Sequence, residues 1–375
     1  MQLSETVKVY PTEYQKNLIT KTMTEYINTV NSLVSDAVSG HSIAKTTTAD
    51  VSANLPSALK NQCIRDARSI VKKHYKNCHK AILKNRSLLK RGSAIRKKAP
   101  SLPILRKPCC YINNQNYTIK DSHIEFPVMV NGKSKRISVF TKLTDRQKTL
   151  FSDAKFGTMR IVIKNHTLVA QIVYEVSEPE LKLDGNVVGV DLGIKCPAVS
   201  YCSDGSIKFY GNGRKNKYIR RHYAYLRKKL QTLKKMKVVK RINDKEQRIM
   251  RDIDHKLSHD IIQTAMAHNV KVIKLEQLQN IRSATRTSRK NNHSLHNWSF
   301  YRLAQFIEYK AKRAGIFVEY VNPAYTSQRC PVCGNVHHAN DRHYECECGF
   351  RIHRDILGAM NICGSTEVVG NRLSA

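Results

Sequence analysis

Three acidic residues stand at the ends of apolar segments, and their order constrains the fold more than any other feature of the chain. Asp191 ends the apolar run 187–190, and Glu276 ends the run 270–275. Both runs are short, rich in β-branched residues and bounded by polar or turn-forming residues, which predicts two buried strands. Asp355 opens a segment whose apolar residues recur at helical spacing, which predicts a helix. Because a carboxylate at the end of a buried strand projects beyond the sheet, we expect the three acids to converge there.

Converging carboxylates offer the oxygen ligands that hard cations such as Mg²⁺ prefer. Two such ions, about 4 Å apart, activate water and stabilise the leaving oxygen of a phosphodiester. Taken one at a time, the acids have simpler interpretations: Asp355 as a helix N-cap, Glu276 as a solvated strand end and Asp191 as a turn former. Their order in a strongly basic chain favours a nuclease site instead. We therefore predict that all three are catalytic residues that bind two Mg²⁺ ions.

The composition of the chain indicates a polyanionic partner. Lysine and arginine number 65 against 29 acidic residues, a formal net charge of +36. Such a surplus makes physical sense when a polyanion neutralises it. Charge alone does not separate DNA from RNA or from an anionic membrane. However, the sequence has no apolar stretch of membrane-spanning length and no signal peptide, so we expect a protein that is not secreted and does not bind membranes.

Four of the eleven cysteines are clustered late in the chain. Cys330 and Cys333 form one pair, Cys346 and Cys348 form a second, and a glycine follows each pair. This spacing predicts one structural Zn²⁺ bound by four thiolates, whereas disulfides are disfavoured because nothing indicates export. The second pair has one intervening residue where two are commoner. Exchange of one ligand for a nearby histidine therefore stays open, the candidates being His337, His338, His343 and His353.

The first half of the chain reads as a mixture of helices and hairpins. The expected segments, in order, are a strand at 7–10, a helix opening at 11–12, a polar gap at 40–52, a second helix with apolar positions 59, 63, 67 and 71 on one face, a basic connector at 84–107, and β-hairpins over 110–178 with a turn near 164–166. The alternating apolar and polar residues of the last segment are typical of a small β-barrel.

Residues 214–243 contain many lysines and arginines and no acid, with tyrosine and leucine interleaved at near-helical spacing. Unpaired like charges destabilise an isolated helix, so we expect this helix to lie along a phosphate backbone. The residues predicted to bind nucleic acid are Arg214, Lys215, Arg220, Arg221, Arg227, Lys228, Lys229, Lys234 and Lys235. His255 and His259 have the spacing of a helical metal site but lack the accompanying glutamate, which favours surface or nucleic-acid contact.

Together these motifs resemble the TnpB family of IS200/IS605-type transposons (OrfB-like), RNA-guided nucleases that are compact relatives of type V CRISPR effectors. Residues 187–195, 273–278 and 354–362 resemble the three nuclease motifs, 326–334 resemble the start of the zinc ribbon, and 297–311 resemble the helix before it. The resemblance is strong over 185–363. In the N-terminal half it is looser, carried by Tyr10-Pro11 and the later hairpins.

The resemblance implies a multidomain chain of the α/β plus β-barrel class. The implied parts are a wedge β-barrel at 1–10 and 100–180, a helical recognition insert with its basic connector at 11–99, an RNase H-like (RuvC) nuclease at 185–327 and 350–363, a zinc ribbon at 328–349, and a C-terminal tail at 364–375. The three acids and the four clustered cysteines match the family's Mg²⁺ and Zn²⁺ ligands by position.

The resemblance also implies a function: a guide RNA pairs with one strand of double-stranded DNA while the protein reads a short flanking motif. It further implies a cytoplasmic, nucleoid-associated protein of a prokaryote. Three alternatives stay open. A nuclease-inactive, RNA-guided repressor would be expected to have lost an acid, and none is lost. A CRISPR-associated type V nuclease would differ in its genomic surroundings. A ribosomal or other RNA-binding protein would explain the charge but not the acids and the zinc ribbon together.

Overall fold

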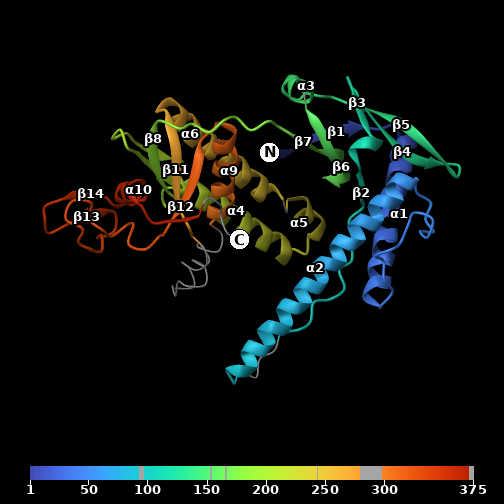
Figure 1. Cartoon of the computed structure of the whole chain (residues 1–375), viewed down its shortest axis with the longest axis horizontal. Helices are drawn as coiled ribbons and strands as arrows, with labels where there is room; N and C mark the ends of the chain where they lie inside the picture. Colours follow the sequence, from blue (N-terminus) through green and yellow to red (C-terminus); the bar gives the residue numbers. More distant parts are fainter. Residues whose placement is uncertain (93–96, 153, 165–166, 243, 279–297, 371–375) are drawn as a thin grey trace. The chain divides into compact units, whose positions relative to one another are not determined.

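The structure is a computed structural model that describes residues 1–92, 97–152, 154–164, 167–242, 244–278 and 298–370. The chain divides into two compact units, Met1–Ser177 and Glu178–Ala375 (Figure 1). Some predicted features lie outside the described residues, namely parts of the connector (93–96), the hairpin turn (165–166), the nuclease segment (279–297) and the tail (371–375). No helix within the described ranges is long and apolar enough to cross a membrane.

The first unit is built on a seven-stranded antiparallel sheet. Its strands are β1 (Gln2–Tyr10), β2 (Cys109–Ile112), β3 (Thr118–Lys120), β4 (His123–Val130), β5 (Lys133–Thr141), β6 (Lys155–Lys164) and β7 (Thr167–Glu175), in the order β2-β6-β7-β1-β5-β4-β3. Strand β1 pairs with β7 along residues 2–8 and with β5 at residues 9–10. The sheet has two edge strands, β2 and β3, so the part of the expected β-barrel that the structure shows is a half-barrel sheet. The first unit also contains a short 3₁₀ helix, η1 (Asn114–Asn116), and an α-helix, α3 (Asp145–Ser152).

Two long helices pack together on this sheet, α1 (Glu13–Val38) and α2 (Ser57–Lys90) (Figure 1). A capping box between Thr12 and Gln15 starts α1, as the sequence predicted for this position. The predicted apolar face of α2 is confirmed, with Leu59, Cys63 and Ala67 buried. The connector was predicted to begin too early. No glycine or proline interrupts the segment before Gly92, so α2 continues to Lys90.

The second unit contains a six-stranded mixed sheet. Its strands are β8 (Asn186–Asp191), β9 (Ala198–Cys202), β10 (Ile207–Tyr210), β11 (Val270–Glu276), β12 (Phe317–Val321) and β15 (Val368–Gly370), in the order β10-β9-β8-β11-β12-β15. Strand β11 runs parallel to both β8 and β12, whereas the other pairs are antiparallel. The strands predicted at 187–190 and 270–275 are therefore confirmed.

Helices and a small hairpin complete the second unit (Figure 1). The helices are α4 (Gly213–Thr232), α5 (Met236–Ile242), α6 (Lys245–Ala267), α9 (Phe300–Arg313) and α10 (Arg354–Gly364), and the hairpin pairs β13 (His343–Glu345) with β14 (Arg351–His353). Apolar residues of β8 and β11 pack in one core with residues of α6 and α9, including Leu257 and Ile307. Helix α10 lies against the opposite side of β8.

Candidate functional site

Asp191 and Glu276 lie at the same edge of the sheet. In the parallel pairing of β8 with β11, Val190 stands opposite Leu275, so the next residue of each strand is one of the two acids. Neighbouring strands lie about 4.8 Å apart, and successive side chains point to opposite faces. Val190 and Leu275 are buried in the core on the α6–α9 side. Both carboxylates therefore face the other side of the sheet, where α10 lies.

Two glycines allow α10 to lie directly on β8. A Cβ at Gly189 would come within 2.2 Å of the Ala359 carbonyl oxygen, a distance that backbone atoms cannot accommodate. A Cβ at Gly358 would lie 3.1 Å from Oδ2 of Asp191. Close contact between helix and strand thus depends on two residues without side chains, and it brings the first turn of α10 to the acidic edge of the sheet.

Asp355 lies in this first turn, and it is not the helix N-cap. The cap is His353, whose ring Nδ1 accepts a hydrogen bond from the Asp355 amide at 3.2 Å. The simpler interpretation of Asp355 as a capping residue is therefore wrong. Its carboxylate, 12% exposed, instead forms an ion pair with Arg342, which precedes β13.

The three acids interact electrostatically. Burial raises the pKa of Asp191 well above its usual range, and the charges of Glu276 and Asp355 raise it further. Burial also raises the pKa of Glu276, and a hydrogen bond from the Thr326 hydroxyl opposes this rise. Each raised pKa means that the site holds more negative charge than its surroundings favour. A bound cation would relieve that excess.

The chemistry of these ligands fits Mg²⁺, because all three are carboxylates on rigid elements. Within the described ranges, only the four cysteines bring three or more ligand atoms within 4.8 Å of one another, so the acids are spaced more widely. Asp191, Glu276 and Asp355 are the residues that would hold the ions.

The cysteine cluster has the geometry of a zinc site. Its four sulfur atoms lie within 4.8 Å of one another, with 3.6 Å between Cys330 and Cys348 and 3.4 Å between Cys333 and Cys346. Tetrahedral Zn–S bonds of about 2.3 Å place sulfurs about 3.8 Å apart, whereas a disulfide joins them at about 2.05 Å. None of the nearby histidines belongs to the cluster, which favours ligation by four cysteines.

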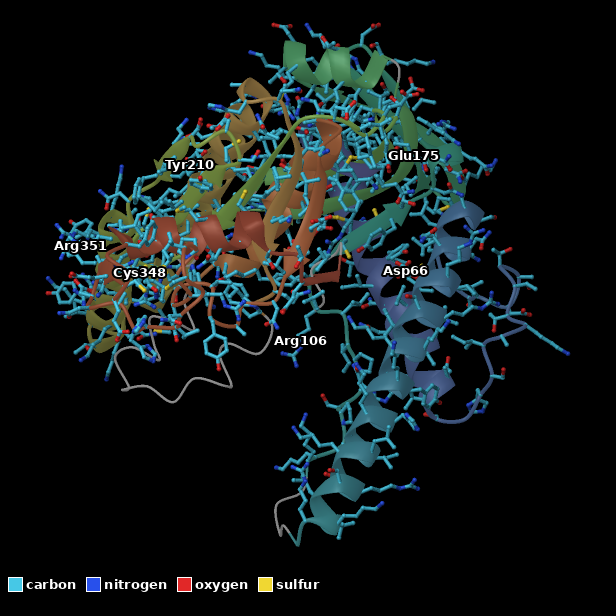
Figure 2. The ribbon with its side chains drawn as sticks, turned by 60° about the vertical axis from the view of Figure 1, so that its left-hand side comes forward. Asp66, Arg106, Glu175, Tyr210, Cys348 and Arg351 are labelled. Atoms are coloured by element: carbon cyan, nitrogen blue, oxygen red, sulfur yellow. The ribbon has the colours of Figure 1, made fainter. Side chains whose placement is uncertain are left out.

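Backbone amides in the cluster favour the thiolate form of Cys330. Gly334 and Gly349 adopt φ angles of +76° and +87°, which an L-residue with a side chain rarely adopts, and their amides close the two turns. Burial raises the pKa of Cys330, but hydrogen bonds from the amides of Cys333 and Val332 outweigh it and lower the pKa to about 6. Cys348 lies in the turn between β13 and β14, and Arg351 begins β14 (Figure 2).

The predicted basic helix is divided in two. Helix α4 ends at Thr232 and α5 begins at Met236, because Lys234 adopts a left-handed conformation with φ +51°. The Lys235 amide then bonds back to the Leu230 carbonyl at 2.9 Å. This C-terminal motif normally has glycine or asparagine at the left-handed position, so the sequence did not reveal the break.

Seven of the nine basic residues predicted to bind nucleic acid are exposed, namely Arg214, Lys215, Arg221, Lys228, Lys229, Lys234 and Lys235. Arg220 and Arg227 are only 24% and 29% exposed, and both pair with Glu246 of α6, at 3.8 and 2.7 Å. These two arginines therefore also hold α4 against α6. His255 stacks on Phe306 at 3.9 Å between ring centroids, so packing is its main contact. His259 is exposed.

The sequence did not indicate a role for Thr326, whose hydroxyl donates to Glu276, or for Arg342, which forms the ion pair with Asp355. Thr326 lies in the segment that resembles the start of the zinc ribbon, so a signal was present. Arg342 lies between the two cysteine pairs, 13 residues before Asp355, and nothing in the cysteine spacing indicates a contact with an acid. Only the folded ribbon brings the two together.

Two family models match the chain. The model described as a probable transposase (OrfB_IS605) matches residues 171–282, and the model described as the Cas12f1-like TNB domain matches residues 300–362. The first match contains Asp191 and Glu276. The second contains Asp355 and all four clustered cysteines.

Relatives and solved structures agree with these matches. A TnpB-like protein of Methanocaldococcus jannaschii is 29% identical over 258 residues, which cover 65% of this chain and 91% of that protein. The CRISPR-associated endodeoxyribonuclease Cas12f1 of Sulfoacidibacillus thermotolerans is 35% identical over 133 residues, 34% of this chain and 30% of that protein. A complex of Cas12f1 with sgRNA and target DNA has a TM-score of 0.57 at 12% identity, covering 98% of this chain and 99% of that one.

A structure of the mini-RNA-guided endonuclease CRISPR-Cas_phi3 has a TM-score of 0.54 at 12% identity, covering 96% of this chain and 92% of that one. At such low identity, the two structural matches establish the fold alone. In fold and in partial sequence matches, the chain resembles the group of compact proteins that includes TnpB-like proteins and Cas12f1. Within this group, the chain is similar in sequence to a TnpB-like protein and to Cas12f1.

Proposed function

We propose that this protein is an RNA-guided DNA endonuclease that cleaves phosphodiester bonds in DNA matching its guide. The observation that carries the proposal is the position of Asp191 and Glu276 at the ends of neighbouring parallel strands, with Asp355 on the helix packed against them. Its relatives support it. Cas12f1 is named an endodeoxyribonuclease, and a solved Cas12f1 structure contains sgRNA and target DNA.

The three carboxylates would hold two Mg²⁺ ions, which activate water and stabilise the leaving oxygen of the phosphodiester. The chain fixes the orientation of these ligands. The Thr326 hydroxyl donates a hydrogen bond to Glu276, and Arg342 forms an ion pair with Asp355. Each of these two carboxylates is therefore restrained by one neighbouring side chain. Burial strengthens the attraction of the acids for a divalent cation, because water screens charges less effectively inside the protein.

We assign the mixed sheet of the second unit to an RNase H-like (RuvC) nuclease formed by residues 185–327 and 350–363. The ribbon at 328–349 would bind one structural Zn²⁺ through Cys330, Cys333, Cys346 and Cys348. A zinc-held ribbon positions Arg342 beside the acids, so the metal would support catalysis without touching the DNA. The sheet of the first unit, at 1–10 and 100–180, would form the wedge, with residues 11–99 as the recognition insert and 364–375 as the tail.

The exposed basic residues of α4 and of the turn after it would bind phosphates of the guide RNA or its DNA hybrid. Their positive charge provides affinity without sequence preference. Sequence choice would come from base pairing with the guide, together with a short flanking motif read by the protein in double-stranded DNA. Relatives of both transposon and CRISPR type support a guided mechanism in either genomic setting.

The test is DNA cleavage by the protein purified together with its RNA. A plasmid that carries the matching target and flanking motif should be cut in Mg²⁺, and one without the target should stay intact. Asp191→Ala should abolish cutting with DNA binding nearly unchanged, because a metal ligand is removed while the phosphate contacts remain. Glu276→Ala and Asp355→Ala should act alike and non-additively, since the acids work as one unit.

Two outcomes would contradict the proposal. Sequence-specific cutting by RNA-free protein would return the chain to the ordinary DNA endonucleases. Tight, guide-dependent binding of a target that is never cut would favour the nuclease-inactive repressor.

A further inference from the structure

Three neighbouring strands of the first unit carry an exposed row of aromatic side chains. Tyr10 of β1 pairs with Phe140 of β5, and Phe140 pairs in turn with His123 of β4. Ring centroids lie 6.0 Å apart between Tyr10 and Phe140 and 5.6 Å apart between Phe140 and His123. Lys120 of β3 pairs with His123 and extends the row by one positive charge. We call Tyr10, Phe140, His123 and Lys120 the cross-strand row.

The row faces solvent, contrary to the usual pattern of an antiparallel sheet. Neighbours along the strands, Val9, Thr141 and Ile124, point to the opposite side and are buried. Tyr10 and Phe140 remain 47% and 46% exposed. A sheet face turned to water normally carries polar side chains, so adjacent exposed rings indicate a surface that binds a partner.

A hollow adjoins the row and shares Phe140 with it. It has a volume of about 680 Å³, and its lining combines the apolar Ile119, Leu143 and Phe151 with Phe140 and with two lysines, Lys142 and Lys148. Lys148 also pairs with Asp145 of its own helix at 3.1 Å, whereas Lys142 has no hydrogen bond or ion pair to any residue that the structure describes. Rings beside ammonium groups match a nucleotide, which presents a flat base and an anionic phosphate.

We propose that the cross-strand row is a stacking platform for an unpaired base of RNA, with the adjoining phosphate and ribose in the hollow. This inference rests on the proposed function in one respect: it takes the RNA that binds the row in the cell to be the guide RNA. Stacking requires a base that is free of its own helix, as in single-stranded loops and ends. Bases inside duplex DNA are already stacked and do not meet this requirement.

The hollow also favours ribose over deoxyribose. Asp121 and Ser122 line it, and Asp121 holds a left-handed backbone with φ +45° at the β3–β4 turn. A carboxylate repels a bare phosphate but accepts a hydrogen bond from a 2′-hydroxyl, the group that distinguishes RNA from DNA. The two lysines and the acid therefore suit a nucleotide that carries both an anion and a hydroxyl donor.

The experiment measures the affinity of the full-length protein for a labelled, unstructured RNA of about 12 nucleotides. The same sequence as DNA and a DNA duplex serve as comparison ligands. Replacing Tyr10 and Phe140 together by serine should weaken RNA binding by about five- to a hundredfold, the worth of one stacked base. Phe140→Trp should keep wild-type affinity, because the indole provides an equivalent ring. Asp121→Asn, which tolerates the same backbone, should reduce the preference for RNA over DNA of the same sequence.

Ile163→Ser is the matched control, since Ile163 lies on the same sheet, is 45% exposed and has no aromatic ring. It should leave affinity unchanged, and thermal unfolding should be the same for all variants. RNA affinity of the Tyr10→Ser/Phe140→Ser variant within twofold of wild type would overturn the platform. An equal loss for the DNA duplex would overturn its assignment to unpaired RNA.

The outcomes separate this inference from the proposed function. If guided cleavage is observed but the row variants bind RNA normally, the platform fails and the function stands. If no RNA copurifies and no guided cleavage occurs, yet the row variants fail to bind synthetic RNA, the function fails and the platform stands. Ultraviolet crosslinking of the copurified complex gives a second measurement, in which peptides containing Tyr10 or Phe140 should carry the crosslinked base.

Discussion

Arg342 of the ribbon forms an ion pair with Asp355 of α10, so the cysteine-bound loop and the third acid of the candidate site are directly joined. The two side chains are 28% and 12% exposed. Removing one partner from such a pair leaves the other charge poorly solvated. The orientation of Asp355 therefore depends on the folding of the ribbon, which comes from a different part of the sequence than the two strand acids.

Arg342→Ala should reduce cleavage by about tenfold or more, the factor typical of residues that orient a metal ligand, while DNA binding changes little. Arg342→Lys should be intermediate, because an ammonium keeps the charge but not the planar fork that matches a carboxylate. Single-turnover cleavage at saturating protein and RNA is the measurement. Equal cleavage rates for Arg342→Ala and wild type would show that the ion pair has no part in the reaction.

Gly358→Ala should impair cleavage, because the new Cβ would lie 3.1 Å from Oδ2 of Asp191 and displace a carboxylate that must bind metal. Gly364→Ala provides the control on the same helix, since a Cβ there meets no described atom within 4 Å. It should leave both activity and stability essentially intact. If the two variants cleave at the same rate, close packing of α10 against Asp191 does not matter for the site.

The sequence predicted the strands that carry Asp191 and Glu276 because buried parallel strands leave short β-branched runs that stand out in any context. It also predicted the cysteine cluster, whose ligands are local in sequence. It missed the Arg342–Asp355 pair, which only the folded ribbon creates. It also missed the break at Lys234, because a left-handed lysine leaves no compositional signal.

Asp191→Asn should stabilise the metal-free protein at neutral pH. The folded-state pKa of Asp191 is raised, chiefly by burial, so its charged form is disfavoured in the fold relative to the unfolded chain. The resulting destabilisation is full at pH values above the raised pKa, shrinks as the pH falls below it, and vanishes below the ordinary pKa of an unfolded-chain aspartate. The gain in Tm over wild type, measured in a chelator, should therefore shrink on acidification.

Added Mg²⁺ provides the control for this stability difference. It should raise the Tm of wild type, because it binds the folded state, and should have little effect on Asp191→Asn. If the Tm of Asp191→Asn in the chelator at neutral pH does not exceed that of wild type, the Asp191 carboxylate is not destabilised by burial.

Zinc removal should inactivate the protein through the ribbon. Metal analysis should find about one zinc per chain, and Cys330→Ser or Cys348→Ser should lower that content and loosen the C-terminal region, because a structural zinc contributes folding free energy. Cleavage should fall more than DNA binding, since Arg342 is no longer held in position. Cys78→Ser, a thiol outside the cluster, should change none of these. Full zinc in the Cys348→Ser variant would point to a histidine as the fourth ligand.

Helix α4 carries two kinds of basic residue: exposed ones that we expect to bind nucleic acid, and partly buried ones that form ion pairs within the protein. Replacing Arg221, Lys228 and Lys229, all exposed, by alanine should weaken binding equally for all target sequences. The dependence on salt should flatten by about 0.9 in slope for each B-DNA phosphate that is no longer neutralised, or about 0.7 on a single strand. Sequence choice should not change, because phosphate contacts carry no base information.

Arg227→Ala on the same helix should act on stability instead. Its partner Glu246 is 12% exposed and would be left with only the longer contact to Arg220, which should cost about 1–3 kcal/mol of folding free energy. Adding Glu246→Gln should recover much of that loss, since it removes the unpaired charge. Thermal unfolding and salt-dependent binding, measured on the three variants side by side, distinguish the two roles. A triple variant with an unchanged salt slope would show that the exposed face of α4 does not touch the nucleic-acid backbone.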